Sequence, residues 1–283
     1  MEMVIDMDDI HGRLRQIQNE FSGRYSLYAE HLGTQEVIQF GTTEPMETAS
    51  TIKLPILVEA LRQVELGQLS LVQPVTLGAA DMVGGSGVLQ SLSTGIALPL
   101  HDVLTLMIAI SDNVATNMTL RIIGLSSVNQ CMAALGLRDT EIKKRIDFAL
   151  PGPLGLSTPS DLARLLKGIY HGTLINARAS EVMRTILATQ QYNTILTRYL
   201  PYELLNSDDD QPPVRVASKS GSLSGVRNDA GLITSPWGDY VIVIMSEAAE
   251  DLRFHPDNEA MVILPKVSRE IFDYFIPEAQ RRI

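Results

Sequence analysis

A serine and a lysine three positions apart could supply a nucleophile and its base. Ser50-Thr-Ile-Lys53 stands where a loop becomes helical, so both side chains would lie on one helical face. The backbone field at a helix N-terminus favours a developing alkoxide, and a desolvated lysine can lose its proton near neutral pH. The alternative is that Ser50 merely caps the helix, because a chain of this size should contain about one Ser-x-x-Lys by composition.

Two further motifs carry residue types suited to the same chemistry. Ser111-Asp-Asn113 lies between two helical patterns, where these residue types are also the preferred helix caps. Lys219-Ser-Gly-Ser222 follows the strand-like segment 214–217, and its glycine would let a ligand approach the backbone closely. The alternative for this lysine is a solvated side chain on an ordinary edge strand. Each motif alone is weak evidence of function.

Strand-like patterns occur towards both ends of the chain, with helical patterns between them. Alternation typical of strands is found at 24–40, 214–217, 231–234 and 240–245. Helical spacing is found at 8–21, 56–66, 100–110, 113–123, 127–135, 160–170, about 178–200 and 259–275. The economical architecture is an α/β (α+β) fold, with one antiparallel sheet from both termini flanked by helices and an all-α domain inserted between. We expect 1–50 plus 214–283 to form a discontinuous sheet domain, 51–213 the inserted domain, and a ligand cleft between them.

Composition excludes several classes of protein. With 283 residues, 45% of them hydrophobic, the chain can bury a core without a disulfide or metal. The 23 basic and 33 acidic residues give a net charge of −10, which argues against nucleic acid as a main partner. The five histidines show no metal-ligand spacing, and the sequence has no dinucleotide fingerprint or Walker loop, so we expect no metal and no cofactor. Cys131 fits a buried helical position.

Membrane and export signals are not evident in the sequence. No apolar run reaches the roughly 18 residues that span a bilayer. The acidic N-terminus has no basic region followed by an apolar one, as a signal peptide would. We expect the chain as given to be cytoplasmic, or exported if a signal has been trimmed. The sequence makes no prediction of oligomeric state.

The three motifs are far stronger evidence together than singly. They occur in the order Ser-x-x-Lys, Ser-Asp-Asn and Lys-Ser/Thr-Gly, starting at positions 50, 111 and 219. With this motif set the chain resembles the class A β-lactamase-like serine hydrolases of the penicillin-recognising superfamily, from the hairpin at 24 to the last helix. Residues 83–89 also look like the loop that many members carry before the Ser-Asp-Asn helix.

The resemblance implies a catalytic role for four side chains. Ser50 would attack a carbonyl and become acylated, and Lys53 would deprotonate it directly or through water. Ser111 would pass a proton to the leaving nitrogen. Lys219 would keep the site positive, orient Ser111 and attract the carboxylate of the substrate.

Further residues would bind the substrate. Asn113 would hydrogen-bond its side-chain amide, Ser220 would bind its carboxylate, and Ser222 would contact it at the reacting carbonyl. The backbone N–H groups of Ser50 and Ser222 would form an oxyanion hole, worth roughly 3 kcal/mol per donor. Arg227 is placed as a carboxylate-binding arginine is in some family members, with a solvated hairpin arginine as the alternative.

The chain departs from true class A enzymes in the loop that carries their water-activating glutamate. Those enzymes have Glu-x-x-Leu-Asn there, whereas residues 145–159 form a shortened, apolar loop without Glu or Asn. Asp147 is the nearest candidate for a substitute base, with a structural loop aspartate as the alternative. Because general-base help contributes about 10²–10⁴-fold, we expect β-lactam acyl-enzymes of this chain to deacylate slowly.

The resulting hypothesis is a serine acyl-transfer hydrolase acting on a β-lactam or a related peptide-like amide that carries a carboxylate. Within enzymes, the rival is a D-Ala-D-Ala peptidase or an esterase using the same serine. A penicillin-binding sensor domain that is acylated without turnover is a rival from another class. A serine-dependent glutaminase would share Ser-x-x-Lys, but the Ser-Asp-Asn motif argues against it.

Overall fold

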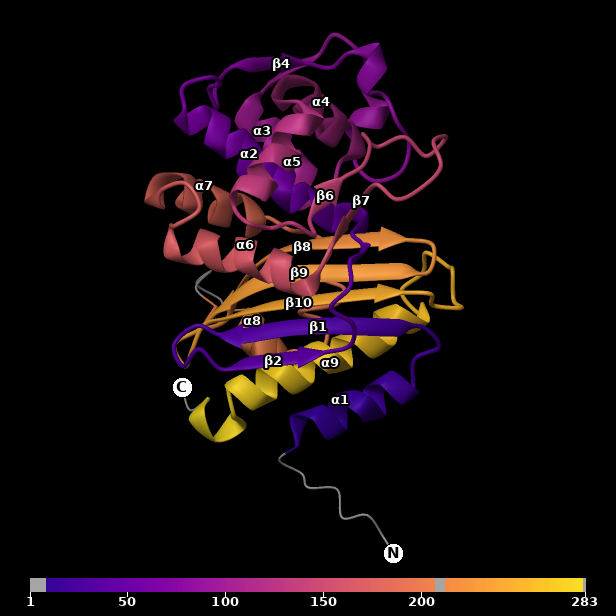
Figure 1. Cartoon of the computed structure of the whole chain (residues 1–283), viewed down its shortest axis with the longest axis vertical. Helices are drawn as coiled ribbons and strands as arrows, with labels where there is room; N and C mark the ends of the chain where they lie inside the picture. Colours follow the sequence, from indigo (N-terminus) through magenta and orange to yellow (C-terminus); the bar gives the residue numbers. More distant parts are fainter. Residues whose placement is uncertain (1–8, 207–211, 282–283) are drawn as a thin grey trace, which may run out of the picture.

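A five-stranded antiparallel sheet joins the two ends of the chain (Figure 1). Its strand order is β2-β1-β10-β9-β8, so the N-terminal hairpin pairs with the C-terminal strands through β1 and β10. The strands are β1 (Arg24–His31), β2 (Val37–Phe40), β8 (Arg215–Leu223), β9 (Val226–Thr234) and β10 (Tyr240–Glu247). The predicted antiparallel sheet from both termini is confirmed, and β8 forms one of its edges.

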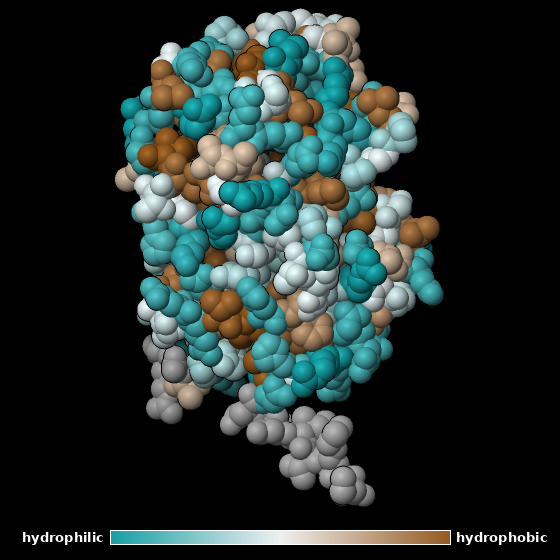
Figure 2. Space-filling model, in the orientation of Figure 1, coloured by the Kyte–Doolittle hydropathy of each residue, from teal (hydrophilic) through white to brown (hydrophobic). Residues whose placement is uncertain are grey.

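The computed structural model describes residues 9–206 and 212–281. Residues 1–8, which entered the export prediction, lie outside the described residues. In the part of the chain that is described, no helix is long and apolar enough to cross a bilayer. The face seen in Figure 2 mixes hydrophilic and hydrophobic residues without one continuous apolar band.

Helices cover both faces of the sheet. On one face, α1 (Ile10–Asn19) packs against α9 (Glu259–Phe275), and α9 packs against β9 and β10. On the other face, α6 (Pro159–His171) contacts β1, β9 and β10 (Figure 1). Further helices are α2 (Lys53–Glu65), α3 (Leu100–Ala109), α4 (Asn113–Ile123), α5 (Leu125–Ala134), α7 (Ala177–Leu187) and α8 (Tyr202–Leu205). Thus α6, from the segment expected to form the insert, packs directly on the sheet.

Two hydrophobic cores lie on opposite faces of the sheet. Val241 and Val243 of β10 belong to the core that packs helices α2 to α7 against the sheet. Ile242 and Ile244 belong to the core shared with α1 and α9. Successive strand residues point to opposite faces, so β10 is buried on both sides and reads as a continuous apolar run in the sequence.

The helix expected at about 178–200 is wrong beyond Leu187, where α7 ends. The apolar residues that continued the helical spacing, Ile195, Leu196 and Leu200, lie in the core beside α9. The hydroxyl of Ser268 in α9 donates to the Leu196 carbonyl at 2.7 Å. The segment after α7 therefore crosses to the other face of the sheet, which a continuing helix would prevent.

Short strands tie the loops around the helical part together. β3 (Met46–Glu47) pairs with β7 (Gly155–Ser157), which pairs with β6 (Glu141–Ile142). β4 (Pro74–Thr76) pairs with β5 (Ala97–Pro99). The first set joins the segment before Ser50 to the loop at residues 145–159.

Candidate active site

Ser50 lies in a short 3-10 turn, η1 (Ala49–Ile52), that leads directly into α2. The cap residue is Thr48 for η1 and Ile52 for α2, so the interpretation of Ser50 as a helix cap is wrong. Ala49 has a φ of 45°, a left-handed conformation that residues with a Cβ rarely adopt. The sharp turn leaves Ser50 half-buried at the start of α2.

Lys53 is fully buried and meets the Ser-Asp-Asn motif. Its Nζ lies 2.7 Å from the Ser111 carbonyl oxygen, 2.9 Å from Ser111 Oγ and 2.9 Å from Asn113 Oδ1. Burial, reinforced by the positive charge of Lys219, lowers the pKa of Lys53 well below its usual value, although the Asp112 carboxylate opposes this shift. A lowered pKa favours the neutral amine, which can accept a proton.

Within the Ser-Asp-Asn motif, Asp112 stabilises the fold, whereas Ser111 contacts the site lysine. Asp112 caps α4 by accepting from Ala115 N at 2.9 Å, and its other oxygen accepts from Val88 N at 2.7 Å and Leu89 N at 2.9 Å. The capping interpretation therefore holds for Asp112. Ser111 has a φ of 52°, a strained turn at the site, and contacts Lys53 instead of capping α4.

The glycine-rich loop at 83–89 wraps around Asn113. Asn113 Nδ2 donates to the Gly84 carbonyl at 3.1 Å, and its backbone N–H donates to the Ser86 carbonyl at 3.0 Å. A Cβ built on Gly87, which has a φ of +104°, would lie 2.2 Å from Asp112 Cγ. Only glycine allows this close approach.

Gly87→Ala should destabilise the fold by about 3 kcal/mol or more, because it combines left-handed backbone strain with a clash against buried Asp112. Gly95→Ala is the matched control, since Gly95 has a similar φ of +93° but no atom within 4 Å of its Cβ position. That control should lose only about 1–2 kcal/mol. Urea unfolding of both variants measures the difference, and equal losses would contradict the clash.

Lys219 brings a second buried amine to the site. It is 0% exposed, so the interpretation as a solvated edge-strand lysine is wrong. Its Nζ donates to the Ser220 carbonyl at 2.7 Å. Burial lowers the pKa of Lys219 to about 7, opposed by the negative charge of Asp229.

Strand β8 lies against the turn that carries Ser50. A Cβ on Gly221 would come within 2.8 Å of Ser50 N and 2.9 Å of the Thr48 carbonyl oxygen, so only glycine lets the strand approach this closely. Asn228 of β9 fastens the same region by donating from Nδ2 to the Glu47 carbonyl at 2.8 Å. Ser222, the other expected oxyanion-hole donor, follows Gly221 in the strand.

Arg227 is placed differently from the other predicted residues. It is 1% exposed, so the interpretation as a solvated hairpin arginine is wrong. Its guanidinium donates to the carbonyls of Leu223 and Val226, and at 2.6 Å to that of Arg253, while the Phe254 ring lies 4.7 Å away. These contacts tie Arg227 to its own hairpin and to the segment that follows β10, and a substrate-binding role stays a prediction that requires them to open.

A family model described as the β-lactamase enzyme family matches residues 10–275. The chain belongs to the β-lactamase enzyme family. Beta-lactamase 1 of Bacillus cereus is 25% identical over 269 residues, which cover 91% of this chain and 83% of that protein. A β-lactamase structure from Sphaerobacter thermophilus is 30% identical with a TM-score of 0.84, covering 96% of this chain and 98% of that one.

A second kind of relative is PBP-A. The structure of this protein is 28% identical with a TM-score of 0.79, covering 92% of this chain and 94% of that one. A leucine-to-glutamate mutant of PBP-A, solved as an acyl-enzyme complex with penicillin G, is 26% identical with a TM-score of 0.82 over 95% and 97%. The chain is thus similar both to proteins named as β-lactamases and to PBP-A.

The loop that lacks the family glutamate is clamped to α4 by Asn117. Asn117 Nδ2 donates to the Ile146 carbonyl, and Ile146 N donates to Asn117 Oδ1, both at 2.9 Å. Asp147 Oδ1 accepts from Ala149 N at 3.0 Å within the loop, as a structural aspartate would. A role for Asp147 as a base stays a prediction.

Sequence reasoning missed two buried polar residues that support the site. Asn117 carried no signal beyond its place in a helical pattern, yet it holds the loop. Asp229, two positions after Arg227, is fully buried, and its negative charge opposes the lowering of the Lys219 pKa. Burial raises the pKa of Asp229 to about 7.

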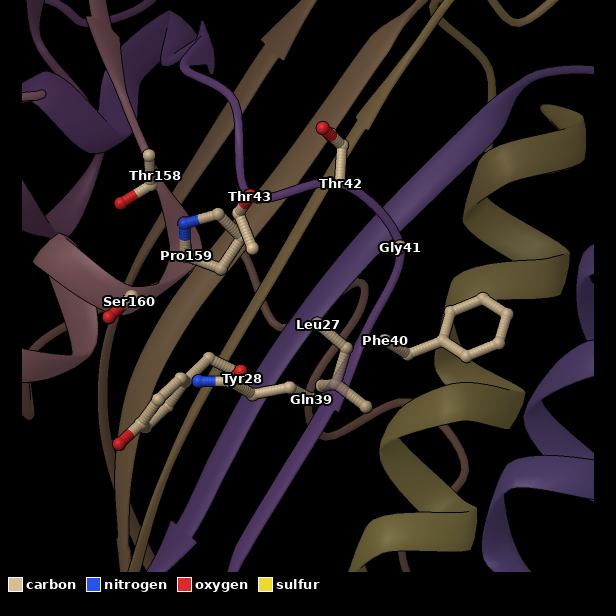
Figure 3. Close-up of a pocket in the computed structure, with 10 residues that line it drawn as sticks. All are labelled: Leu27, Tyr28, Gln39, Phe40, Gly41, Thr42, Thr43, Thr158, Pro159 and Ser160. Atoms are coloured by element: carbon tan, nitrogen blue, oxygen red, sulfur yellow. The ribbon is translucent and has the colours of Figure 1, made fainter.

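Other features of the described residues lie apart from this site. A cavity of about 270 Å³ is bordered by β1, β2 and the start of α6 (Figure 3). Tyr28, Thr43 and Ser160 are among its lining residues, but no predicted site residue is. Within the described ranges, no group of three or more His, Cys, Asp or Glu side chains could hold a metal ion.

Proposed function

We propose that the protein is a serine acyl-transfer hydrolase that acts on a β-lactam, or a related amide carrying a carboxylate, through an acyl-enzyme on Ser50. The observation that carries this proposal is the buried Lys53 amine, held by Ser111 and Asn113 one helical turn from Ser50. A lysine exposed to solvent would be neither buried nor hydrogen-bonded to two residues of the Ser-Asp-Asn motif. The likeness to the β-lactamases of Bacillus cereus and Sphaerobacter thermophilus supports a β-lactam as the substrate.

Acylation replaces the C–N bond of the substrate by a bond to Ser50 Oγ and requires three proton transfers. Neutral Lys53 accepts the Ser50 hydroxyl proton, directly or through water, while Ser50 Oγ attacks the substrate carbonyl. The backbone N–H groups of Ser50 and Ser222 stabilise the oxyanion. When the C–N bond breaks, Ser111 donates its proton to the leaving nitrogen and recovers one from Lys53, 2.9 Å away.

The carboxylate of the substrate is drawn by the buried positive charge of Lys219 and bound by Ser220. A charge in a low-dielectric site attracts an anion more strongly than a solvated one does. Lys219 is fully protonated only below its lowered pKa of about 7. Binding of a carboxylate substrate should therefore weaken as the pH rises through that value.

Deacylation is slow in this proposal because no loop glutamate activates water. The candidate carboxylate on this loop, Asp147, accepts a hydrogen bond from Ala149 N within its own loop. The penicillin G acyl-enzyme of the PBP-A mutant supports the idea that this fold can hold such an adduct.

Mixing the protein with benzylpenicillin should give a covalent adduct on Ser50 that persists for many turnover times of an ordinary β-lactamase. Intact-protein mass spectrometry measures the adduct, and iodometry or absorbance measures penicillin consumption. Ser50→Ala should give neither adduct nor hydrolysis. Rapid penicillin consumption without an adduct would contradict slow deacylation, and turnover by Ser50→Ala would place the chemistry elsewhere.

A D-Ala-D-Ala peptidase, or a penicillin-binding domain acylated without turnover, is the second candidate. The likeness to PBP-A favours it. A panel of chromogenic cephalosporin, a D-Ala-D-Ala peptide, a short acyl ester and glutamine separates these activities. Peptide cleavage faster than cephalosporin hydrolysis would favour the peptidase, and glutamine hydrolysis would favour a glutaminase.

A further inference from the structure

The Phe148 ring and the Asn113 amide meet over one glycine. A Cβ built on Gly85 would lie 2.7 Å from Asn113 Nδ2 and 3.4 Å from Phe148 Cε2. Gly85 has a φ of +98°, which suits glycine, and its missing side chain leaves room for both groups. An aromatic ring thus lies beside the amide that is proposed to bind the acyl side of the substrate.

Hydrogen bonds of two residues that precede Phe148 in the loop fix the backbone that carries its ring. Ile146 is held by its reciprocal pair of hydrogen bonds with Asn117, and the Arg145 guanidinium donates to the Ala80 carbonyl. These contacts attach the loop to α4 and to the segment before the glycine-rich loop. The ring is therefore presented next to Asn113 by a fixed backbone.

Phe148 is nevertheless 55% exposed, and Val88 at the other end of the glycine-rich loop is 51% exposed. Exposed apolar side chains at the rim of a site gain free energy when a ligand covers them. An aromatic ring gains further from a second ring in offset or edge-to-face geometry. These exposed groups favour an apolar, aromatic ligand group over a charged one.

We propose that Phe148 is a specificity-determining residue that packs against an aromatic ring on the acyl group of the substrate, beside the amide bound by Asn113. This inference rests on the proposed acylation of Ser50. Benzylpenicillin has such a ring one methylene from its side-chain carbonyl, and the related PBP-A mutant forms an acyl-enzyme with penicillin G. The occupant is therefore a phenylacetyl-type group.

The test compares acylation by benzylpenicillin with acylation by the penicillin whose side chain is acetyl, which keeps the amide but lacks the ring. The second-order rate of adduct formation is measured by intact-protein mass. In Phe148→Ala, the preference for benzylpenicillin over the acetyl compound should fall about 3–10-fold relative to the unaltered protein. Phe148→Tyr should keep the preference.

Leu150→Ala is the matched control, since Leu150 is an exposed apolar residue on the same loop that does not border Gly85. It should keep the preference of the unaltered protein. An unchanged preference in Phe148→Ala, or an equal loss in Leu150→Ala, would overturn the proposal. Failure of both penicillins to acylate the unaltered protein would instead overturn the proposed function, and thermal unfolding checks that every variant is folded.

Discussion

Replacing Lys53 with methionine should slow acylation by benzylpenicillin about 10²–10⁴-fold, because it removes the proposed general base. Methionine fills a similar buried volume without an amine. The acyl-enzyme that still forms should remain on Ser50, since the nucleophile is intact. Rapid-quench mass spectrometry measures the rate of adduct formation.

Two controls separate loss of the base from loss of the fold. Lys143→Met removes an exposed lysine that pairs with Glu141 and should leave the rate unchanged. Thermal unfolding should show a folded Lys53→Met protein, although the Ser111 and Asn113 acceptors lose their partner. Acylation within about fivefold of the unaltered rate would contradict the role of Lys53 as the base.

The pH profile gives an independent check of the same role. Neutral Lys53 is the active form, so acylation should rise with pH through its lowered pKa. Protonated Lys219 attracts the carboxylate, so acylation should fall again as the pH passes about 7. The rising limb should vanish in Lys53→Met and the falling limb should remain.

The motif chemistry could be predicted from the sequence because it depends on residue type and order. Ser-x-x-Lys, Ser-Asp-Asn and Lys-Ser-Gly pointed to Lys53, Ser111 and Asn113, whose side chains now lie within hydrogen-bonding distance. The sheet was equally readable, since residues 231–234 at the end of β9 and 240–245 of β10 have strand-like patterns with a turn between them. Both signals are local in the chain.

Features decided by tertiary contacts could not be predicted in this way. The burial of Lys219 and Arg227 depends on what packs over the strands, and a sequence pattern reads the same for a solvated lysine or arginine. The left-handed turns at Ala49 and Ser111 are held by surrounding contacts against local preference. The false extension of α7 had the same cause, because Leu196 is buried by α9.

The site therefore concentrates groups that oppose folding. Two amines with lowered pKa values are buried together, and Ala49 and Ser111 carry backbone strain. A site that binds an anion must hold positive charge away from water before the substrate arrives. Removing this buried charge should therefore raise the free energy of unfolding.

Lys219→Met should make the protein more stable at pH 7 by about 1–4 kcal/mol, because burial disfavours the charged amine and the Asp229 carboxyl, with its pKa raised to about 7, can take up a proton when the lysine is absent. Acylation by carboxylate substrates should be largely lost. The pKa of Lys219 is about 7 when folded and near 10.5 when unfolded, so the unfolded chain binds the proton more tightly. The native state loses stability as the pH falls from 10.5 towards 7, and the gain in Lys219→Met should shrink towards zero as the pH approaches 10.5.

Urea unfolding at pH 7 and pH 9.5 measures this, with Lys266→Met as the surface control, since Lys266 pairs with Glu20 in solvent. A Lys219→Met protein less stable than the unaltered one at pH 7 would show that the buried amine stabilises the fold.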